Sequence, residues 1–324
     1  MLEFQSLQLA IIIVNFRTPL MVTDCLETLL PELKDVDGRV IVVDNCSGDN
    51  SSAIIESWIN NYDTTGQVHF LQSEGNSGFA GGNNVGIKSI SADFYLLLNS
   101  DTLVHPKAIR IILETALHFP EAGLVSPRLE WPDGTGQESC FRFQTPFSEL
   151  IGASQTGMVE RLLRKYIIAM PVQTQVAWPQ WTSFACVLIK AEVFKKIGLL
   201  DEGYFMYFED VEFCHRARKA GYKIVHNPDA RVVHLRGGSS PVKEQTRLKK
   251  RVPKYFYESR TRYFCQTYGW AGLTSANLLW WMGRLISRTR QSMGRSDKAA
   301  IEGQWLDIWT NWFNPLKSNT LPKS

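Results

Sequence analysis

The chain has 324 residues, of which 44% are hydrophobic and 21% charged, and its formal net charge is +3. These values are typical of a globular protein that buries a sizeable core, and they exclude dependence on a disulfide scaffold. The six cysteines are scattered and show no Cys-x-x-Cys spacing of a zinc or redox site, which favours a reducing compartment.

The N-terminal residues show no features of a targeting segment. Residues 1–10 contain Glu3 and no Lys or Arg, so they lack the basic start of a secretory signal. The apolar run 9–14 is too short to cross a bilayer, and we interpret it as a buried first strand. We therefore expect a cytoplasmic protein.

The first hundred residues alternate between short β-rich runs and helical stretches. Strands are predicted at residues 9–15, 39–44, 68–72 and 94–98, and helices at 18–33, 51–61 and 81–90. This alternation predicts an α/β fold with a Rossmann-like, mainly parallel central sheet flanked by helices. Ligands bind at the carboxyl ends of the strands in such sheets, so the polar residues after each run are candidate site residues.

Asn15 and Asp44 end the first two apolar runs. A carboxylate at a strand end can accept hydrogen bonds from a nucleobase imide or a ribose hydroxyl, as in dinucleotide-binding folds. The alternative role for Asp44 is that of a turn residue or helix N-cap.

Residues 74–86 contain five glycines and run into a predicted helix. Such a loop can bring backbone N–H groups close to a diphosphate, although a Gly-rich segment is more often only a turn. It is not a P-loop, because no Gly-Lys-Ser/Thr follows. It is not the dinucleotide fingerprint either, because the first strand leads into residues 15–19 without glycine. This absence counts against an NAD-dependent oxidoreductase.

Residues 96–101 form an apolar run that ends in Asn99, Ser100 and Asp101. We expect Asp101 to project into the same cleft as Asp44. Mg²⁺ and Mn²⁺ prefer oxygen ligands and share them with substrate phosphates. The alternative is that Asp101 caps the next helix, with Pro106 at the start of that helix.

After Pro127 the regular alternation fades, and residues 204–216 place acidic residues after a run of aromatics. Glu209 and Asp210 are adjacent, so on a helix they point about 100° apart and need not share one role. One could act as a base while the other positions an acceptor. Arg216 and Arg218 are possible structural partners for both acids.

A strand pair is predicted at residues 223–226 and 230–235, with a turn at Asn227-Pro228-Asp229. His234 lies at the end of the second strand, and a lone His in such a place is usually not a ligand. Arg236 follows it at the start of a Gly-Gly-Ser loop, where a guanidinium suits the charge of a diphosphate.

The chain beyond Ser239 is basic and predicted to be helical. Residues 243–262 hold eight Lys or Arg and two Glu, and residues 284–298 hold five Lys or Arg and one Asp. Such clusters indicate an anionic partner. A helical face is formed by Leu278, Trp281, Met282 and Leu285. A basic helix with such a face can lie in a membrane interface, and docking on the rest of the protein is the alternative.

Several of these motifs occur in succession, at residues 12–16, 42–45, 76–84, 97–101, 205–211 and 233–239. Together they resemble the family 2 inverting glycosyltransferases of the GT-A fold, and among these the rhamnosyltransferase-like branch of bacterial surface polysaccharide synthesis. The resemblance covers about residues 9–240, and Phe-Met-Tyr-Phe-Glu-Asp-Val is its most specific part. It implies a GT-A domain at residues 1–240 and a basic, mostly helical C-terminal extension at 241–324.

The resemblance implies a role for each matched residue. Asp101 ends the family's Asp-x-Asp-type motif and would bind Mg²⁺ or Mn²⁺ together with His234. Asp210 matches the catalytic base, with Glu209 beside it. The donor-binding candidates are Asn15, Asp44, Asn76, Gly78, Phe79, Asn83, Asn99 and Arg236.

Two positions depart from the family pattern. Asn99 stands in the first position of the Asp-x-Asp-type motif, which removes one charge from the metal site. Phe184 stands where family members often carry Gly, which leaves the shape of the acceptor pocket open.

The implied reaction transfers a sugar from a nucleotide diphosphate donor to a glycan or polyprenyl-diphosphate-linked acceptor, with L-rhamnose from dTDP-rhamnose as the best match. A UDP-hexose donor is one alternative, and a non-catalytic sugar-nucleotide-binding protein is another. No recognised nucleic-acid motif accompanies the basic tail, so we expect no nucleic-acid partner. We expect peripheral contact with the cytoplasmic face of the inner membrane through residues 243–298.

Overall fold

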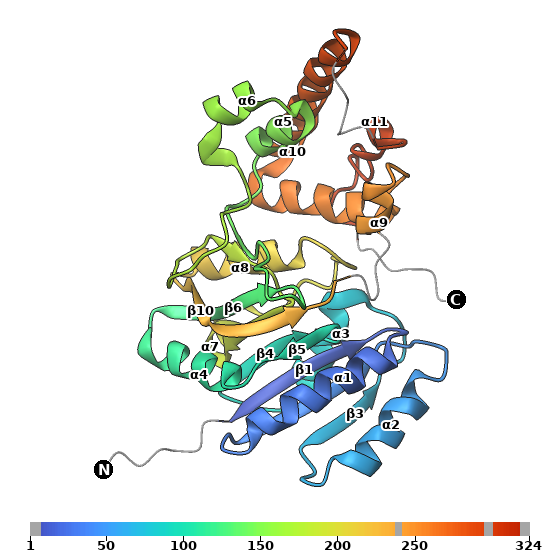
Figure 1. Ribbon diagram of the computed structural model, residues 1–324. Helices are drawn as coiled ribbons and strands as arrows, with labels where there is room; N and C mark the ends of the chain where they lie inside the picture. Colours follow the sequence, from blue (N-terminus) through green and yellow to red (C-terminus); the bar gives the residue numbers. More distant parts are fainter. Residues whose placement is uncertain (1–7, 237–241, 295–300, 318–324) are drawn as a thin grey trace.

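The computed structural model describes residues 8–236, 242–294 and 301–317 (Figure 1). Within these residues a central eight-stranded sheet has the order β3-β2-β1-β4-β9-β6-β10-β5. Its strands are β1 (Leu9–Asn15), β2 (Gly38–Asp44), β3 (Val68–Gln72), β4 (Phe94–Asn99), β5 (Thr102–Val104), β6 (Ala122–Glu130), β9 (Cys186–Lys190) and β10 (Lys223–His234). A separate two-stranded sheet pairs β7 (Cys140–Phe141) with β8 (Trp181–Thr182).

The N-terminal part of the sheet is parallel, because β1 pairs in parallel with β2 and β4, and β2 with β3. The connections are α1 (Pro19–Leu29) with a 3-10 turn η1 (Leu30–Leu33), α2 (Ser51–Tyr62) and α3 (Gly78–Ser89). Successive strand residues point to opposite faces, so Ile11 and Ile12 of β1 enter different core clusters. Both faces are covered, which explains the uninterrupted apolar runs and confirms the α/β prediction.

The C-terminal part of the sheet is mixed. Strand β9 is antiparallel to both β4 and β6, whereas β10 is parallel to β6 and antiparallel to the short β5. Helices α4 (Ala108–His118), α7 (Ala191–Ile197) and α8 (Glu209–Lys219) complete this part. Strand β9 separates β4 from β6, which an alternation of strands and helices does not predict.

The predicted strand pair at residues 223–235 is wrong. Residues 223–234 form one strand, β10, which pairs with β6 along its length and shifts register between Asn227 and Arg231. The Oδ1 of Asn227 accepts from the backbone N–H of Asp229 at 3.0 Å, and its Nδ2 donates to Thr115 Oγ1 at 2.8 Å. The Asn-Pro-Asp sequence therefore makes an irregularity inside a strand, because the chain continues along the same neighbour instead of reversing.

The remaining helices form a layer beyond α8 (Figure 1). They are α5 (Pro146–Ser154), α6 (Gly157–Leu162), the 3-10 turn η2 (Arg164–Tyr166), α9 (Val242–Arg247), α10 (Lys254–Ser292) and α11 (Gln304–Asp307). Helix α10 bends at Gly269, whose φ is 68°. Its second half packs so closely on α5 that a Cβ on Gly283 would lie 2.8 Å from the Leu150 carbonyl oxygen. Residues 146–166 therefore share this layer with the C-terminal segment.

The described helices include none that is both long and apolar enough to span a bilayer. The Gly-Gly-Ser loop that follows Arg236 and residues 295–298 of the predicted membrane segment lie outside the described residues.

Candidate active site

The carboxyl ends of β1, β2 and β4 meet at one edge of the sheet, as the parallel register requires. Asn15 is the register partner of Asp44, and the neighbouring Val14 is the partner of Asn99. Asn15 Nδ2 donates to Asp44 Oδ1 at 2.6 Å. The backbone N–H of Asn99 donates to the Ala185 carbonyl at 2.9 Å, which joins this edge to the start of β9.

Asp44 is buried, and protein donors surround its carboxylate. Oδ2 accepts from the backbone N–H of Ser47 at 3.1 Å and from Gln72 Nε2 at 2.9 Å. Oδ1 accepts from Asn15 and from the Ser47 hydroxyl. Asp44 thus holds the turn at Ser47, which was the alternative role. A nucleotide could bond to the Asp44 carboxylate only by replacing one of these four protein donors.

The glycine-rich segment folds against the end of β2. Asn45 Nδ2 donates to Asn76 Oδ1 at 3.1 Å and to the Gly78 carbonyl at 2.9 Å. Asn76 Oδ1 also accepts from the backbone N–H of Gly78 at 3.0 Å. Helix α3 begins at Gly78, earlier than predicted, so residues 78–86 of the segment are helical. A helix N-terminus favours an anion such as a diphosphate.

Gly78 brings this helix into contact with the segment before α8. Its φ is +72°, and a Cβ there would lie 1.9 Å from the Phe205 carbonyl oxygen. The same carbonyl accepts from the backbone N–H of Phe79 at 2.8 Å. Asn83, one turn further along α3, is buried and donates through Nδ2 to the Phe79 carbonyl at 2.9 Å. Only glycine fits here, because any side chain at residue 78 would meet backbone.

Asp101, between β4 and β5, lies close to His234, which ends β10. Asp101 follows β4 and precedes β5, so it does not cap α4, which begins at Ala108. The backbone N–H of Leu235 donates to the Asp101 carbonyl at 2.9 Å. His234 Nε2 lies 3.4 Å from Asp101 Oδ1, and both side chains are buried.

This pair suits a divalent cation. The 3.4 Å separation is longer than a good hydrogen bond and close to the roughly 3 Å between adjacent ligands of an octahedral cation at about 2.1 Å. His234 Nδ1 is buried and has no hydrogen-bond partner within the described part of the chain. In that same part no three His, Cys, Asp or Glu side chains converge, so a cation here would take its other ligands from substrate and water.

Gln137 joins His234, the last residue of β10, to Arg236, and it was missed by the sequence analysis. Its Nε2 donates to the His234 carbonyl at 2.7 Å and to the Glu130 carbonyl at 3.0 Å, and its Oε1 accepts from Arg236 Nε. The Arg236 guanidinium also lies 5.2 Å from the centre of the Trp131 ring. A single glutamine in a loop carries no sequence signal for such a role.

Glu209 and Asp210 open helix α8, and desolvation raises the pKa of both carboxyls. Burial, and secondly the neighbouring Asp210, raises the pKa of Glu209 well above its usual value. Burial also raises the pKa of Asp210, to about 7, while a hydrogen bond from the Val211 backbone N–H to Oδ1 at 2.8 Å opposes this rise. Glu209 Oε2 is buried and unpartnered among the described residues. Burial therefore favours the protonated form of Glu209, and Asp210 gains or loses its proton near neutral pH, as a general base must.

The backbone before this pair is unusual. Tyr207 and Phe208 both have φ of 69°, and neither is glycine. A left-handed conformation costs roughly 1–2 kcal/mol for each such residue, and residues of this kind cluster at functional sites.

Arg216 and Arg218, the possible structural partners of Glu209 and Asp210, make other contacts. Arg216 pairs with Glu212 at 2.7 Å and donates to the carbonyls of Ile197 and Leu199. Arg218 Nη1 approaches the Pro179 carbonyl at 3.5 Å. Phe184 is buried in the core, 5.9 Å from the ring of Phe213.

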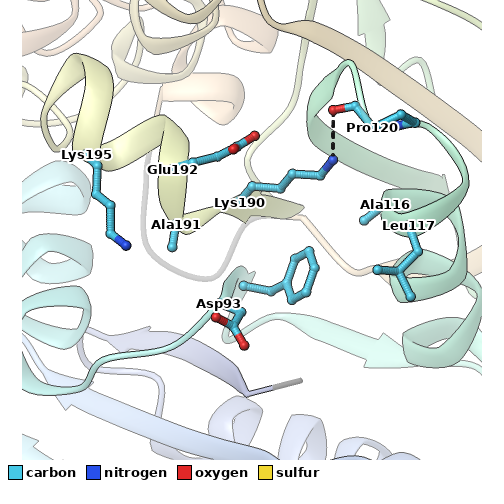
Figure 2. A pocket seen from close by; sticks show the side chains of 9 residues that line it. Asp93, Ala116, Leu117, Pro120, Lys190, Ala191, Glu192 and Lys195 are labelled. Atoms are coloured by element: carbon cyan, nitrogen blue, oxygen red, sulfur yellow. Dashed lines mark hydrogen bonds between the residues drawn. The ribbon is translucent and has the colours of Figure 1, made fainter. Parts of the chain in front are cut away.

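The segment before α8 contacts the start of α3, and α8 contacts a strand next to the loop that follows Gln137. Phe79 bonds to Phe205, shortly before α8, and α8 packs on β8. Thr182 of β8 donates to the Ser139 carbonyl at 3.0 Å, two residues after Gln137. A surface hollow of about 430 Å³ lies elsewhere, at the opposite edge, where Phe94 begins β4 opposite Lys190. Figure 2 shows Lys190 there, donating to the Pro120 carbonyl at 3.1 Å.

Comparisons with known proteins agree on one family. Residues 7–252 match the family model described as glycosyltransferase like family 2. The chain is 29% identical over 251 residues to the low-salt glycan biosynthesis hexosyltransferase Agl10 of Haloferax volcanii, covering 76% of this chain and 72% of the relative. It is 30% identical over 159 residues to the N-acetylglucosaminyl-diphospho-decaprenol L-rhamnosyltransferase of Mycobacterium tuberculosis, covering 46% of this chain and 48% of the relative.

Solved structures share the fold at low sequence identity. The mannosyltransferase PcManGT of Pyrobaculum calidifontis, in complex with GDP-Man and Mn²⁺, aligns with a TM-score of 0.57 and 11% identity over 95% of this chain and 84% of its own. Residues 1–349 of TarS from S. aureus, in complex with UDP, align with a TM-score of 0.53 and 16% identity over 96% and 80%.

Proposed function

Because the chain belongs to glycosyltransferase family 2 and is a glycosyltransferase, we propose that it transfers a sugar from a nucleotide diphosphate donor to an acceptor hydroxyl with inversion at the anomeric carbon. In this proposal the candidate residues act together at the carboxyl edge of the sheet of this GT-A fold. The observation that carries the proposal is the desolvated pair at the start of α8, in which Glu209 is buried and the pKa of Asp210 is raised to about 7, together with the close approach of His234 to Asp101.

In this mechanism Asp210 is the general base. Oδ1 is held by the Val211 backbone N–H, and Oδ2 accepts the proton from the acceptor hydroxyl. The acceptor oxygen forms a bond to the anomeric carbon as the bond from that carbon to the diphosphate oxygen breaks, so the nucleoside diphosphate leaves. Glu209, kept protonated by its surroundings, can donate a hydrogen bond to the acceptor.

Asp101 and His234 would hold Mg²⁺ or Mn²⁺. A bound cation neutralises charge on the donor diphosphate and makes it a better leaving group. The N-terminus of α3 would favour the negative charge of the diphosphate through the helix dipole, because the backbone N–H groups of Gly78 and Phe79 already donate to Asn76 and Phe205. Arg236, held by Gln137 and Trp131, adds a fixed positive charge beside His234.

The donor-binding roles of Asn15, Asp44, Asn76, Asn83 and Asn99 are part of this proposal. Asn15 and Asp44 fix each other, and Asn76 fixes the start of α3. We therefore assign them mainly to shaping the nucleotide pocket.

For the donor we propose dTDP-L-rhamnose, and for the acceptor a glycan or polyprenyl-diphosphate-linked sugar. The name of the mycobacterial relative supports both choices, because it specifies L-rhamnose and a decaprenyl-diphosphate acceptor. The alternative donor is a UDP-hexose, and the hexosyltransferase name of the Haloferax relative supports its hexose.

A panel of nucleotide sugars with Mg²⁺ or Mn²⁺ tests the proposal. Product formation on a prenyl-diphosphate-sugar analogue should require one donor and the cation, and should fall by about 10²–10⁴-fold in Asp210→Asn while donor binding survives. Near-normal transfer by Asp210→Asn would overturn the role of Asp210. Transfer from UDP-hexoses alone would replace the rhamnose assignment.

We also propose peripheral contact with the cytoplasmic face of the inner membrane through residues 243–298. On α10 the side chains of Leu278, Met282 and Leu285 are 55%, 49% and 57% exposed, and they lie on one face. The opposite face docks on α5, where Arg290 donates to the Ser154 carbonyl at 3.3 Å. Helix α10 therefore packs on the protein through one face and exposes Leu278, Met282 and Leu285 on another. Vesicle flotation should show association at low salt, and no association there would remove the proposal.

A further inference from the structure

The four residues before the catalytic pair, 205–208, have a backbone that needs external support. Tyr207 and Phe208 both adopt φ of 69°, and Phe208 is the residue from which α8 starts. Asp210 is only two residues further on. Any relaxation of Tyr207 or Phe208 toward an ordinary backbone conformation would turn the first residues of α8 and redirect the Asp210 carboxylate.

Side chains on one face of the first half of helix α10 contact each residue of the segment 205–208. Phe256 lies against two rings, with its centroid 5.6 Å from that of Tyr207 and 5.7 Å from that of Phe208. The Ser259 hydroxyl donates to the Met206 carbonyl at 3.1 Å, and Ser259 is fully buried. The flanking contacts are Tyr255 with Phe205 at 5.4 Å and Tyr263 with Phe208 at 5.6 Å.

These contacts come from a part of the chain outside the strands that build the site. Helix α10 follows β10, and its first half lies next to α8 (Figure 1). Aromatic pairs at such separations attract each other beyond simple burial. Phe256 is the centre of the set, because its ring contacts the rings of both left-handed residues.

We propose that Phe256 is a positioning residue for the reaction, which holds Tyr207 and Phe208 in their left-handed conformations and thereby aims Asp210 at the acceptor. This inference rests on the proposed role of Asp210 as base. It assigns the first half of α10 to the catalytic unit, in addition to any role of the second half at a membrane.

The test compares Phe256→Leu with Phe256→Tyr and with a matched control. Leu keeps the apolar contact but loses the ring, and we expect kcat to fall about tenfold, while the donor Kd measured by calorimetry stays within twofold. Tyr restores the ring and should restore kcat. The control is Trp270→Leu, because Trp270 is on the same helix and its ring contacts Trp312 at 5.2 Å. It should leave kcat unchanged.

A double-mutant cycle separates positioning from general destabilisation. If Phe256 acts through Asp210, Phe256→Leu should have little further effect in an Asp210→Asn background, because the base it positions is gone. A full tenfold loss in that background would overturn the inference, as would normal kcat in Phe256→Leu itself.

Ser259→Ala provides a second variant should Phe256→Leu fold poorly. It removes the hydrogen bond to the Met206 carbonyl and should lower kcat in the same non-additive manner, and an unchanged kcat would count against the inference. Failure of the proposed function gives a different pattern, because Asp210→Asn would then keep its activity whatever the effect of Phe256→Leu.

Discussion

Replacement of Asp210 by Asn changes one oxygen to nitrogen, and it should have opposite effects on activity and on stability. Removal of a general base typically costs about 10²–10⁴-fold in rate, so transfer should fall by that factor while donor binding survives. Stability should rise at alkaline pH, because the wild-type protein buries a carboxyl that is ionised there.

The size of the stability effect follows from the pKa of Asp210, which burial raises from 3.8 to about 7. A raised carboxyl pKa favours the folded state fully below the unfolded pKa, and this contribution is lost as pH rises through the folded pKa. Such a rise corresponds to at most about 4 kcal/mol, of which roughly 2.5 kcal/mol develops between pH 5 and pH 8. The wild-type protein should lose that amount relative to Asp210→Asn over this interval.

The assay is urea unfolding of both proteins at pH 5 and pH 8, together with transfer rates. Asp35→Asn is the control, because Asp35 is exposed on the surface, and it should leave both rate and stability unchanged. The reasoning is refuted if the stabilities of wild type and Asp210→Asn stay parallel across the two pH values, since the carboxyl would then not be desolvated.

Three further predictions concern the same edge of the sheet. Because Asp210 acts ionised, kcat/KM should rise with pH and level off above about 7, and a rate that falls through this range would contradict its role as base. Asp101→Ala should weaken donor binding in the presence of Mn²⁺ but not in EDTA, as calorimetry can measure; equal loss in both conditions would argue against a cation at Asp101. Gly78→Ala should destabilise the fold by more than about 2 kcal/mol, since it combines a left-handed alanine with a Cβ 1.9 Å from a carbonyl oxygen. Gly75→Ala, where a Cβ meets nothing within 4 Å, is its control in thermal unfolding.

The environment of the two acids explains why their roles differ. They are adjacent in sequence and both are desolvated, but the charge of Asp210 further raises the pKa of Glu209, whereas Asp210 Oδ1 is held by the Val211 backbone N–H at 2.8 Å. A helix N-terminus also favours a negative charge. The carboxylate is therefore kept at Asp210 and the proton at Glu209, which suits the transfer of a proton from an acceptor.

Local pattern alone determined much of the fold. The apolar runs that end at Asn15, Asp44 and Asn99 predicted parallel strands, and parallel strands bring their carboxyl ends to one edge. The candidate residues at these ends could therefore be named from the sequence, because their placement depends on strand direction and periodicity.

Tertiary contacts decided the rest. The sequence around Asn227 has the residues of a turn, but its neighbour β6 keeps it in one strand. Three contacts join residues that are far apart in the chain. Asp101 lies beside His234, Gly78 packs against the Phe205 carbonyl, and the ring of Phe256 contacts that of Phe208. The high pKa of Asp210 comes from burial. Such contacts and burial exist only once the chain is folded, because no short window of sequence contains both partners.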